Sequence, residues 1–262
     1  MVIDSHRHFW HYTDAEFGWI EDDCLRRDFL PADCGGMDPC VAVEARQCVE
    51  ETNWLLDLAD KHDFIKGVVG WLPIAADDFV KTLDGFLTAN HSKLVAIRHV
   101  VQDEPDDGFI LRPDFVRGVR KLLSRGFAYD ILVFERHLPN VLKFVDALPD
   151  DARLVLDHLG KPAALDSWRA RVTELARREN VFCKLSGLVT EIGVAADPRP
   201  YLDVALEAFG PSRLMFGSDW PVVTAHMGYG DWKGVVESFA SRLSTSEHEA
   251  VMGGNARRFY RL

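Results

Sequence analysis

The first residues of the chain that could do chemistry are two histidines separated by one residue, in Asp4-Ser5-His6-Arg7-His8. Side chains alternate faces along a strand, so Asp4, His6 and His8 are expected on one face and Ser5 and Arg7 on the other. Two imidazoles at this spacing can reach one metal ion without distortion of the backbone. A His-x-His segment is common, however, and alone it also fits a pair of core histidines.

Two more polar residues end apolar runs later in the chain. His158 comes at the end of one run, directly before a break at Gly160 and Pro162, and Asp219 ends another, after Gly217. A carboxylate at that position could bind a metal or take a proton from water. His158 could instead be a satisfied core histidine, and Asp219 a cap on the next turn. If the fold brings these two residues together with His6 and His8 at one end of its strands, the group favours a catalytic site.

The elements that would position these residues alternate between short apolar runs and longer amphipathic stretches, which is typical of parallel βαβ units. The expected strands are Val2–His8, Val41–Gln47, Ile65–Trp71, Leu94–His99, Ala128–Phe134, Arg153–Leu159, Val181–Gly187 and Arg213–Asp219. The expected helices include Glu50–His62, Phe115–Arg125, Leu138–Ala147, Ser167–Arg178 and Pro200–Phe209.

Eight such units predict an α/β fold, a (β/α)₈ TIM barrel, which forms a single domain over residues 1–262. Active sites of such barrels lie at the C-terminal ends of the strands, where the four residues would meet. A doubly wound sheet is disfavoured, because the turn after the first strand reads His8-Phe9-Trp10-His11 and has no glycine-rich phosphate loop.

Two segments are longer than ordinary loops, Phe9–Cys40 after the first strand and Asp103–Asp114 after the fourth. Both are expected to lie over the catalytic face. Helical stretches over Ser246–Met252 and Asn255–Tyr260 are expected to close the ring.

The overall composition excludes several partner classes. The net charge of −11 repels nucleic acid and anionic membrane surfaces. The five cysteines form no paired C-x-x-C motif, so neither a disulfide framework nor a structural zinc site is expected. The N-terminus has no signal-peptide pattern, and no stretch approaches the ~20 apolar residues that span a bilayer, so a cytoplasmic protein is expected. The sequence does not specify the oligomeric state.

Six segments, in order along nearly the whole chain, resemble the amidohydrolase superfamily, in its amidohydrolase 2 type of sugar lactonases, and they are most similar to the L-fuconolactonase group. These segments are Asp4-Ser5-His6-Arg7-His8-Phe9-Trp10, Arg98-His99 with Gln102-Asp103-Glu104, Tyr129-Asp130-Ile131-Leu132-Val133-Phe134-Glu135, Leu156-Asp157-His158-Leu159-Gly160-Lys161-Pro162, Cys183-Lys184-Leu185-Ser186-Gly187-Leu188-Val189-Thr190-Glu191 and Phe216-Gly217-Ser218-Asp219-Trp220-Pro221.

The resemblance implies metal ligation by His6, His8, His158 and Asp219, with Asp219 and His158 also catalytic. Arg98-His99 stand where a bridging carboxylated lysine would be needed for two ions, so one divalent ion or none is implied. Nitrogen and carboxylate ligands make zinc the first choice, although members of the branch differ in whether they need the ion.

The implied reaction is hydrolysis of a small-molecule sugar lactone such as L-fucono-lactone, with Asp219 as general base and the ion or the histidines polarising the carbonyl. The alternative is a metal-dependent decarboxylase of the same superfamily. A barrel that binds carbohydrate without catalysis is disfavoured, because the polar residues stand where chemistry needs them.

Four more residues are candidates for substrate contact. Trp71, Arg98 and His99 end the third and fourth strands, where they could stack on a sugar ring or donate hydrogen bonds. Arg98 could instead serve as a structural ion-pair partner. Lys184 of the seventh strand needs a partner if it is buried, and one sequence does not fix the face on which it lies.

Overall fold

The computed structural model of the chain describes residues 1–88 and 92–262. Eight parallel strands follow one another around the sheet in chain order. The strands are β1 Asp4–Arg7, β2 Cys40–Val43, β3 Ile65–Gly70, β4 Leu94–Val100, β5 Ala128–Leu132, β6 Leu154–Leu156, β7 Val181–Leu185 and β8 Leu214–Phe216. A parallel bridge between Arg7 and Trp220 joins the end of β8 to β1. The predicted (β/α)₈ barrel is therefore confirmed.

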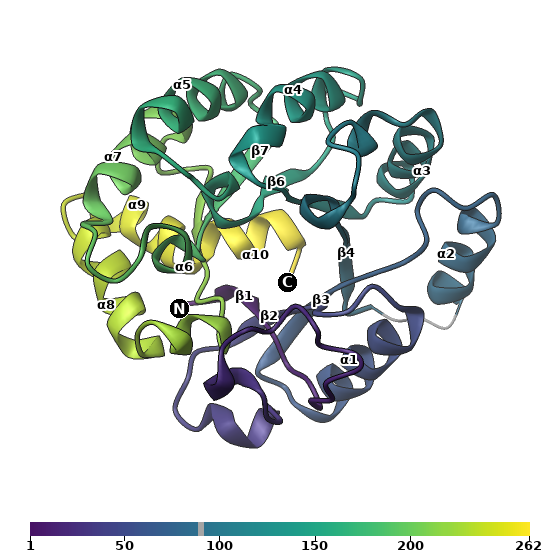
Figure 1. Cartoon of the computed structure of the whole chain (residues 1–262), viewed down its shortest axis with the longest axis horizontal. Helices are drawn as coiled ribbons and strands as arrows, with labels where there is room; N and C mark the ends of the chain where they lie inside the picture. Colours follow the sequence, from purple (N-terminus) through teal and green to yellow (C-terminus); the bar gives the residue numbers. More distant parts are fainter. Residues whose placement is uncertain (89–91) are drawn as a thin grey trace.

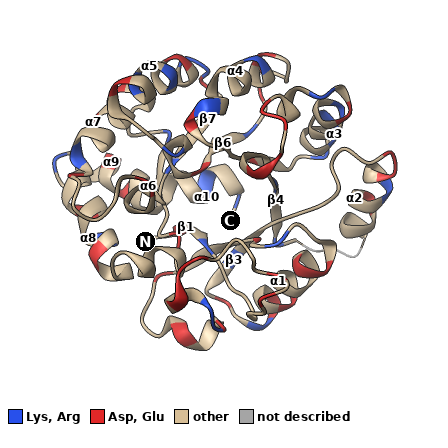
Figure 2. Cartoon of the chain, in the orientation of Figure 1, with Lys and Arg blue, Asp and Glu red and all other residues tan. Residues whose placement is uncertain are grey.

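Most helices form a ring around the strands, whereas the last helix, Asn255–Tyr260, lies across the barrel and does not close the ring as the sequence predicted (Figure 1). The helices are α1 Val49–Lys61, α2 Phe79–Thr88, α3 Pro113–Ser124, α4 Leu138–Asp146, α5 Leu165–Ala176, α6 Leu188–Ile192, α7 Arg199–Phe209, α8 Tyr229–Ala240, α9 Thr245–Glu249 and α10 Asn255–Tyr260. Helices α2, α6 and α8 add to those that periodicity predicts. Acidic and basic side chains are interspersed around this ring (Figure 2). Within the two described ranges, none of the helices has the length and apolarity that crossing a membrane requires.

Helix α3 illustrates why these segments fold as they do. It begins with Pro113 at its first turn, where the missing N–H is not needed. Its buried residues Phe115, Gly118, Val119 and Leu122 follow helical spacing and face the barrel. A Cβ at Gly118 would lie 2.0 Å from the backbone oxygen of Ile74, so only glycine permits this close approach.

Strand β1 departs from simple alternation of faces. Its register against β2 shifts between Asp4 and Arg7, which places three steps of β1 against two of β2. As a result the Asp4 carboxylate accepts a hydrogen bond from Arg7 Nε at 3.1 Å, although alternation put these residues on opposite faces. Asp4 Oδ2 also accepts from Ser218 Oγ at 2.6 Å. The Asp4 carboxylate is thus engaged by Arg7 and Ser218, while His6 and His8 still converge as expected, with 3.1 Å between their Nε2 atoms.

The C-terminal helix α10 covers one end of the barrel interior. Phe259 and Tyr260 belong to a buried cluster with strand residues such as Val41 and Val155. The Tyr260 hydroxyl donates a hydrogen bond of 2.7 Å to Asp130 Oδ2 on β5. The C-terminal helix thus contacts, through Tyr260, a polar group in the interior of the barrel.

Candidate active site

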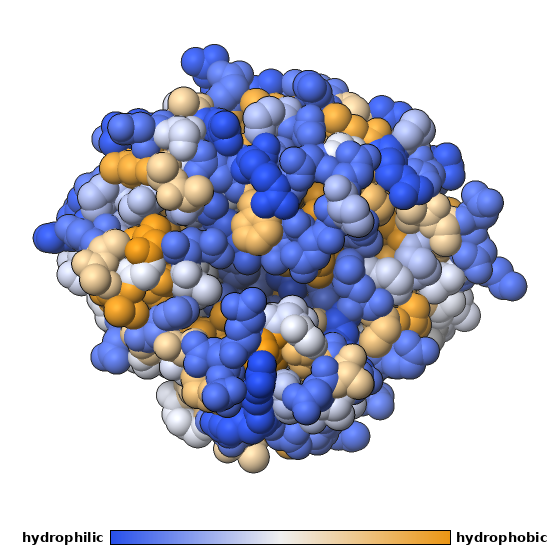
Figure 3. Space-filling model, in the orientation of Figure 1, coloured by the Kyte–Doolittle hydropathy of each residue, from blue (hydrophilic) through white to orange (hydrophobic). Residues whose placement is uncertain are grey.

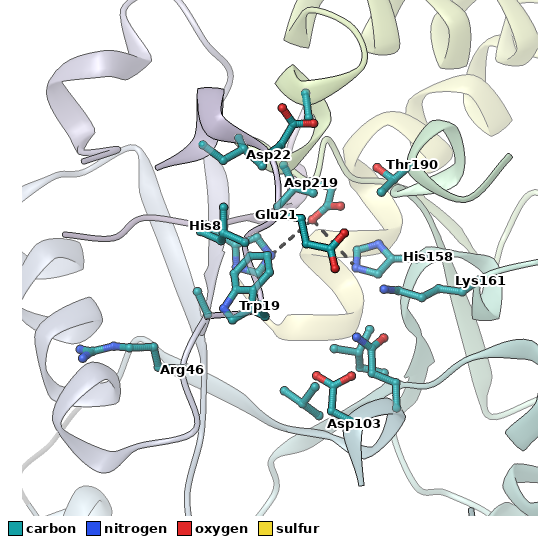
Figure 4. Close-up of a pocket in the computed structure, with 18 of the residues that line it drawn as sticks. His8, Trp19, Glu21, Asp22, Arg46, Asp103, His158, Lys161, Thr190 and Asp219 are labelled. Carbon is teal, nitrogen blue, oxygen red and sulfur yellow. Dashed lines mark ion pairs between the residues drawn. The ribbon is translucent and has the colours of Figure 1, made fainter. Parts of the chain in front are cut away.

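The structure brings together the four residues expected at the barrel mouth. Oδ1 of Asp219 lies 3.3 Å from His8 Nε2, 3.8 Å from His6 Nε2 and 3.9 Å from His158 Nε2. The two first-strand histidines are equally close, with 3.1 Å between their Nε2 atoms. All four side chains are buried, and none of the four residues is more than 5% exposed. One carboxylate oxygen is thus surrounded by three imidazoles, and Figure 4 shows two of them, His8 and His158, beside Asp219.

Local backbone conformation directs these side chains toward one another. The backbone N–H of Asp219 donates to the carbonyl of His6 at 2.9 Å, which ties the end of β8 to β1. His158 and Asp219 both have positive φ, +52° and +59°. A left-handed non-glycine residue costs about 1–2 kcal/mol, and such strain is concentrated at functional sites.

The residues present fit a divalent metal ion. One ligand atom each from His6, His158 and Asp219 lies within 4.8 Å of the others. His8 Nδ1 is 2.9 Å from the Val43 carbonyl, to which only an N–H can donate, so His8 Nε2 keeps its lone pair. His158 Nδ1 is similarly held by Ser186 Oγ at 2.9 Å. Three nitrogens and a carboxylate are a ligand set that suits zinc.

The protonation states agree with this chemistry. Burial lowers the pKa of His158 to about 4, and burial together with the charge of Lys184 lowers the pKa of His6 well below its usual value. Both imidazoles are therefore neutral near pH 7, as metal ligation requires. Burial alone would raise the pKa of Asp219, but the surrounding histidines, His158 above all, outweigh it, so the carboxyl pKa is lowered.

A network of buried charges lies beneath the histidines. Lys184 Nζ is 2.5 Å from Asp130 Oδ2 and 2.9 Å from Asp157 Oδ1. Arg98 Nη1 reaches Asp157 Oδ2 at 3.1 Å, while Arg98 Nε donates to Glu44 Oε1 at 2.8 Å. Sequence reasoning did not assign Glu44, Asp130 or Asp157. Charged residues inside otherwise apolar strand runs were the signal that could have identified them.

The four candidates for substrate contact lie in different surroundings. Arg98 lines the cavity above the site, but its guanidinium is bound by Glu44 and Asp157. Lys184 is fully buried in the network beneath the histidines. Trp71 Nε1 donates to His99 Nδ1 at 3.2 Å, and His99 Nε2 donates to Glu104 at 2.7 Å. Lys184, Trp71 and His99 are absent from the described residues that line the cavity.

The cavity itself has a volume of about 840 Å³, within the usual range for small-molecule sites. His8, His158 and Asp219 are among its lining residues, and Figure 3 shows the hollow bordered mostly by hydrophilic side chains. Both long loops contribute to its wall, as the sequence predicts. Residues that sequence analysis left without a role also line it, namely Trp19, Glu21, Asp22, Gln102, Asp103, Lys161 and Thr190.

The eight-stranded barrel thus gathers His6 of β1, His8 directly after it, His158 after β6 and Asp219 after β8, a group suited to hydrolytic chemistry. The amidohydrolase family matches residues 3–262, and the chain belongs to that family. It is 43% identical over its full length to the L-fucono-1,5-lactonase of Burkholderia multivorans, of which 96% is covered. It is 36% identical to the L-fucono-1,5-lactonase of Burkholderia ambifaria, over 99% of this chain and 95% of that protein.

A solved structure of an amidohydrolase from Burkholderia multivorans with bound zinc superposes with a TM-score of 0.94 at 42% identity, covering 100% of this chain and 99% of that one. Solved decarboxylases superpose at 12–13% identity, which shows a shared fold alone.

Proposed function

We propose that the protein is a carboxylic ester hydrolase that opens a sugar aldonolactone, such as L-fucono-lactone, to the sugar acid. The observation that carries the proposal is Asp219 Oδ1, set among three imidazoles where the strands open into the cavity. Two relatives that match essentially the whole chain are named as L-fucono-1,5-lactonases, and this supports the same reaction. The substrate is a small molecule, and the site is proposed to work in the cytoplasm.

A lactone is a cyclic ester, so its opening needs a water molecule, a base and a proton for the leaving oxygen. Asp219 is proposed to take a proton from water as the water oxygen bonds to the carbonyl carbon. The bond from that carbon to the ring oxygen then breaks, and the proton returns from Asp219 to the ring oxygen. Its lowered pKa keeps the carboxylate ionised and ready to accept that proton at neutral pH.

One divalent ion, with zinc as first choice, is proposed to be held by His6, His8, His158 and Asp219. When bound, it would act as a Lewis acid that polarises the lactone carbonyl. The protein's own contribution is orientation. Val43 and Ser186 hold the ring nitrogens of His8 and His158 that face away from the site.

Among the four candidates for substrate contact, we propose that Arg98 faces the lactone from the cavity wall. For Trp71 and His99 we propose a supporting role, because His99 binds Glu104 in the loop that carries the cavity residue Asp103. Lys184 is proposed to orient His6 from below.

A pH-indicator assay of acid release tests the function, using sugar γ- and δ-lactones headed by L-fucono-lactone. Asp219→Asn should lower kcat by about 10²–10⁴-fold, the usual contribution of a general base. Asp60→Asn, on the exposed face of α1, serves as the matched control. Folded wild type that releases no acid from any lactone, but releases CO₂ from aromatic acids, would move the assignment to decarboxylation.

A further inference from the structure

Two polar atoms on the cavity wall have no partner. Gln102 Oε1 and Thr190 Oγ1 are buried, and neither makes a hydrogen bond within residues 1–88 and 92–262. Both residues line the cavity. A buried polar group left unpaired costs about 1–3 kcal/mol, and nearly all such groups in native proteins are satisfied. Because both side chains line the cavity, a ligand that enters it could supply the hydrogen bonds that these oxygens lack.

Lys161 is a third polar group of this wall, and its cation is the least committed there. Arg98 and Arg46, which also line the cavity, are held by carboxylates at 2.8 Å and 2.7 Å. The ammonium of Lys161 has one carboxylate neighbour within the described chain, Glu191 Oε1 at 3.3 Å. An ammonium has three N–H donors, so one contact leaves donors free. Figure 4 shows the Lys161 side chain pointing into the cavity beside His158.

A single strained turn carries Lys161 and His158 together. The segment from His158 to Lys161 is left-handed throughout, with φ of +52° at His158 and +50° at Lys161. Three of its residues are not glycine, so the turn is costly and persists only where the surroundings demand it. Its effect is to place the Lys161 ammonium, which contacts Glu191 and the Phe134 ring, next to one of the histidines that surround Asp219.

The chemistry of this wall fits the hydroxyl groups of a sugar. Lys161 donates, Gln102 Oε1 accepts, and Thr190 can do either. Carboxylates at Glu21, Asp22 and Asp103 add acceptors elsewhere in the lining. We propose that Lys161, Thr190 and Gln102 form a subsite that binds the ring hydroxyls of the lactone and so selects a polyhydroxylated substrate. The inference rests on the proposed lactonase function and deepens it.

The test compares a substrate with hydroxyls and one without. Wild type, Lys161→Met and Thr190→Val are assayed with L-fucono-lactone and with δ-valerolactone, which has the ester but no hydroxyl. The ratio of the two kcat/KM values should fall by about 10–100-fold in Lys161→Met, and by about 3–10-fold in Thr190→Val, because charged hydrogen bonds are the stronger. Lys143→Met, an exposed lysine of α4, is the control and should keep the wild-type ratio.

A change in stability or in the catalytic group would alter kcat/KM for both substrates by the same factor and leave their ratio unchanged. An unchanged ratio in Lys161→Met and Thr190→Val therefore overturns the proposed subsite. Binding of L-fucitol, a neutral polyol, measured by calorimetry, separates this failure from failure of the proposed function. If wild type opened no lactone, the lactonase assignment would fail. The subsite would then stand if Lys161→Met weakened L-fucitol binding at least tenfold, and would fall if the affinity were unchanged.

Discussion

Lys184 Nζ lies 3.1 Å from His6 Nδ1, so a buried ammonium contacts the nitrogen of His6 that faces away from Asp219. The same ammonium contacts Asp130 and Asp157. Asp130 in turn accepts from Tyr260 of the last helix. A continuous chain of polar contacts therefore runs from the C-terminal helix, through the barrel interior, to the first candidate ligand. Through these contacts, the orientation of His6 depends on residues that do not line the cavity.

Loss of the Lys184 charge should destabilise the fold. Lys184→Met leaves the Asp130 and Asp157 carboxylates buried without their shared cation, and removal of one partner from a buried ion pair costs about 3–5 kcal/mol. Urea denaturation measures the change in the free energy of unfolding. Lys66→Met on the exposed side of β3 should change it little. Adding Asp130→Asn to Lys184→Met should recover part of the loss, and a double variant as unstable as the sum of the single ones would contradict this account.

Zinc should stabilise the protein through the histidine cluster. A ligand that binds only the folded state adds about 2.7 kcal/mol at a concentration 100 times its Kd. We expect zinc to raise the Tm of chelator-treated wild type, and the increase to be largely lost in His158→Ala. His11→Ala, an exposed histidine paired with Asp28, should respond like wild type. An equal increase in His158→Ala and wild type would place the ion elsewhere.

Acid should weaken the fold partly through His99. Burial lowers the pKa of this imidazole from its usual 6.5. The unfolded chain therefore binds a proton that the folded chain does not, and stability falls as pH drops below about 6.5. His99→Phe keeps the aromatic contacts with Phe109 and Phe115 but cannot titrate. The difference in unfolding free energy between pH 7 and pH 5 should be smaller in the variant; an identical difference would exclude His99 as a contributor.

Much of the fold and the four clustered residues could be predicted from local patterns. Apolar runs identify strands, and parallel strands bring their C-terminal ends to one mouth, so the sequence alone predicts that His6, His158 and Asp219 lie together. The shift in β1 could not be predicted in this way, because the extra residue between Asp4 and Arg7 is defined only by pairing with β2.

The wall of the cavity was harder to predict for a related reason. Lys161 and Thr190 lie in a turn and a short helix whose direction depends on tertiary packing, and periodicity carries no information on it. Trp71 and His99 are residues for which a general rule about sequence position led to the wrong expectation of cavity contact. Strand-end position is a correct general guide to the catalytic face, but these two side chains bond to each other instead of lining the cavity.

Gly187 should be required for the position of His158. It follows β7 with φ of +63°, and a Cβ there would lie 2.6 Å from both Cγ and Nδ1 of the His158 ring. Gly210 has nearly the same φ, +67°, but a Cβ at that position would meet nothing within 4 Å, and it stands before β8. Alanine at either position therefore strains the backbone, whereas only alanine at Gly187 displaces the imidazole.

We expect Gly187→Ala to lower lactonase kcat by about 100-fold or more, since small misplacements of catalytic groups have effects of that size. Gly210→Ala should lose stability while it keeps most of its activity, as measured by denaturation and by acid release on the same samples. If both variants lost stability and activity in parallel, backbone strain alone would explain Gly187. A selective loss of activity in Gly187→Ala would show that the space left by this glycine holds His158 against Asp219.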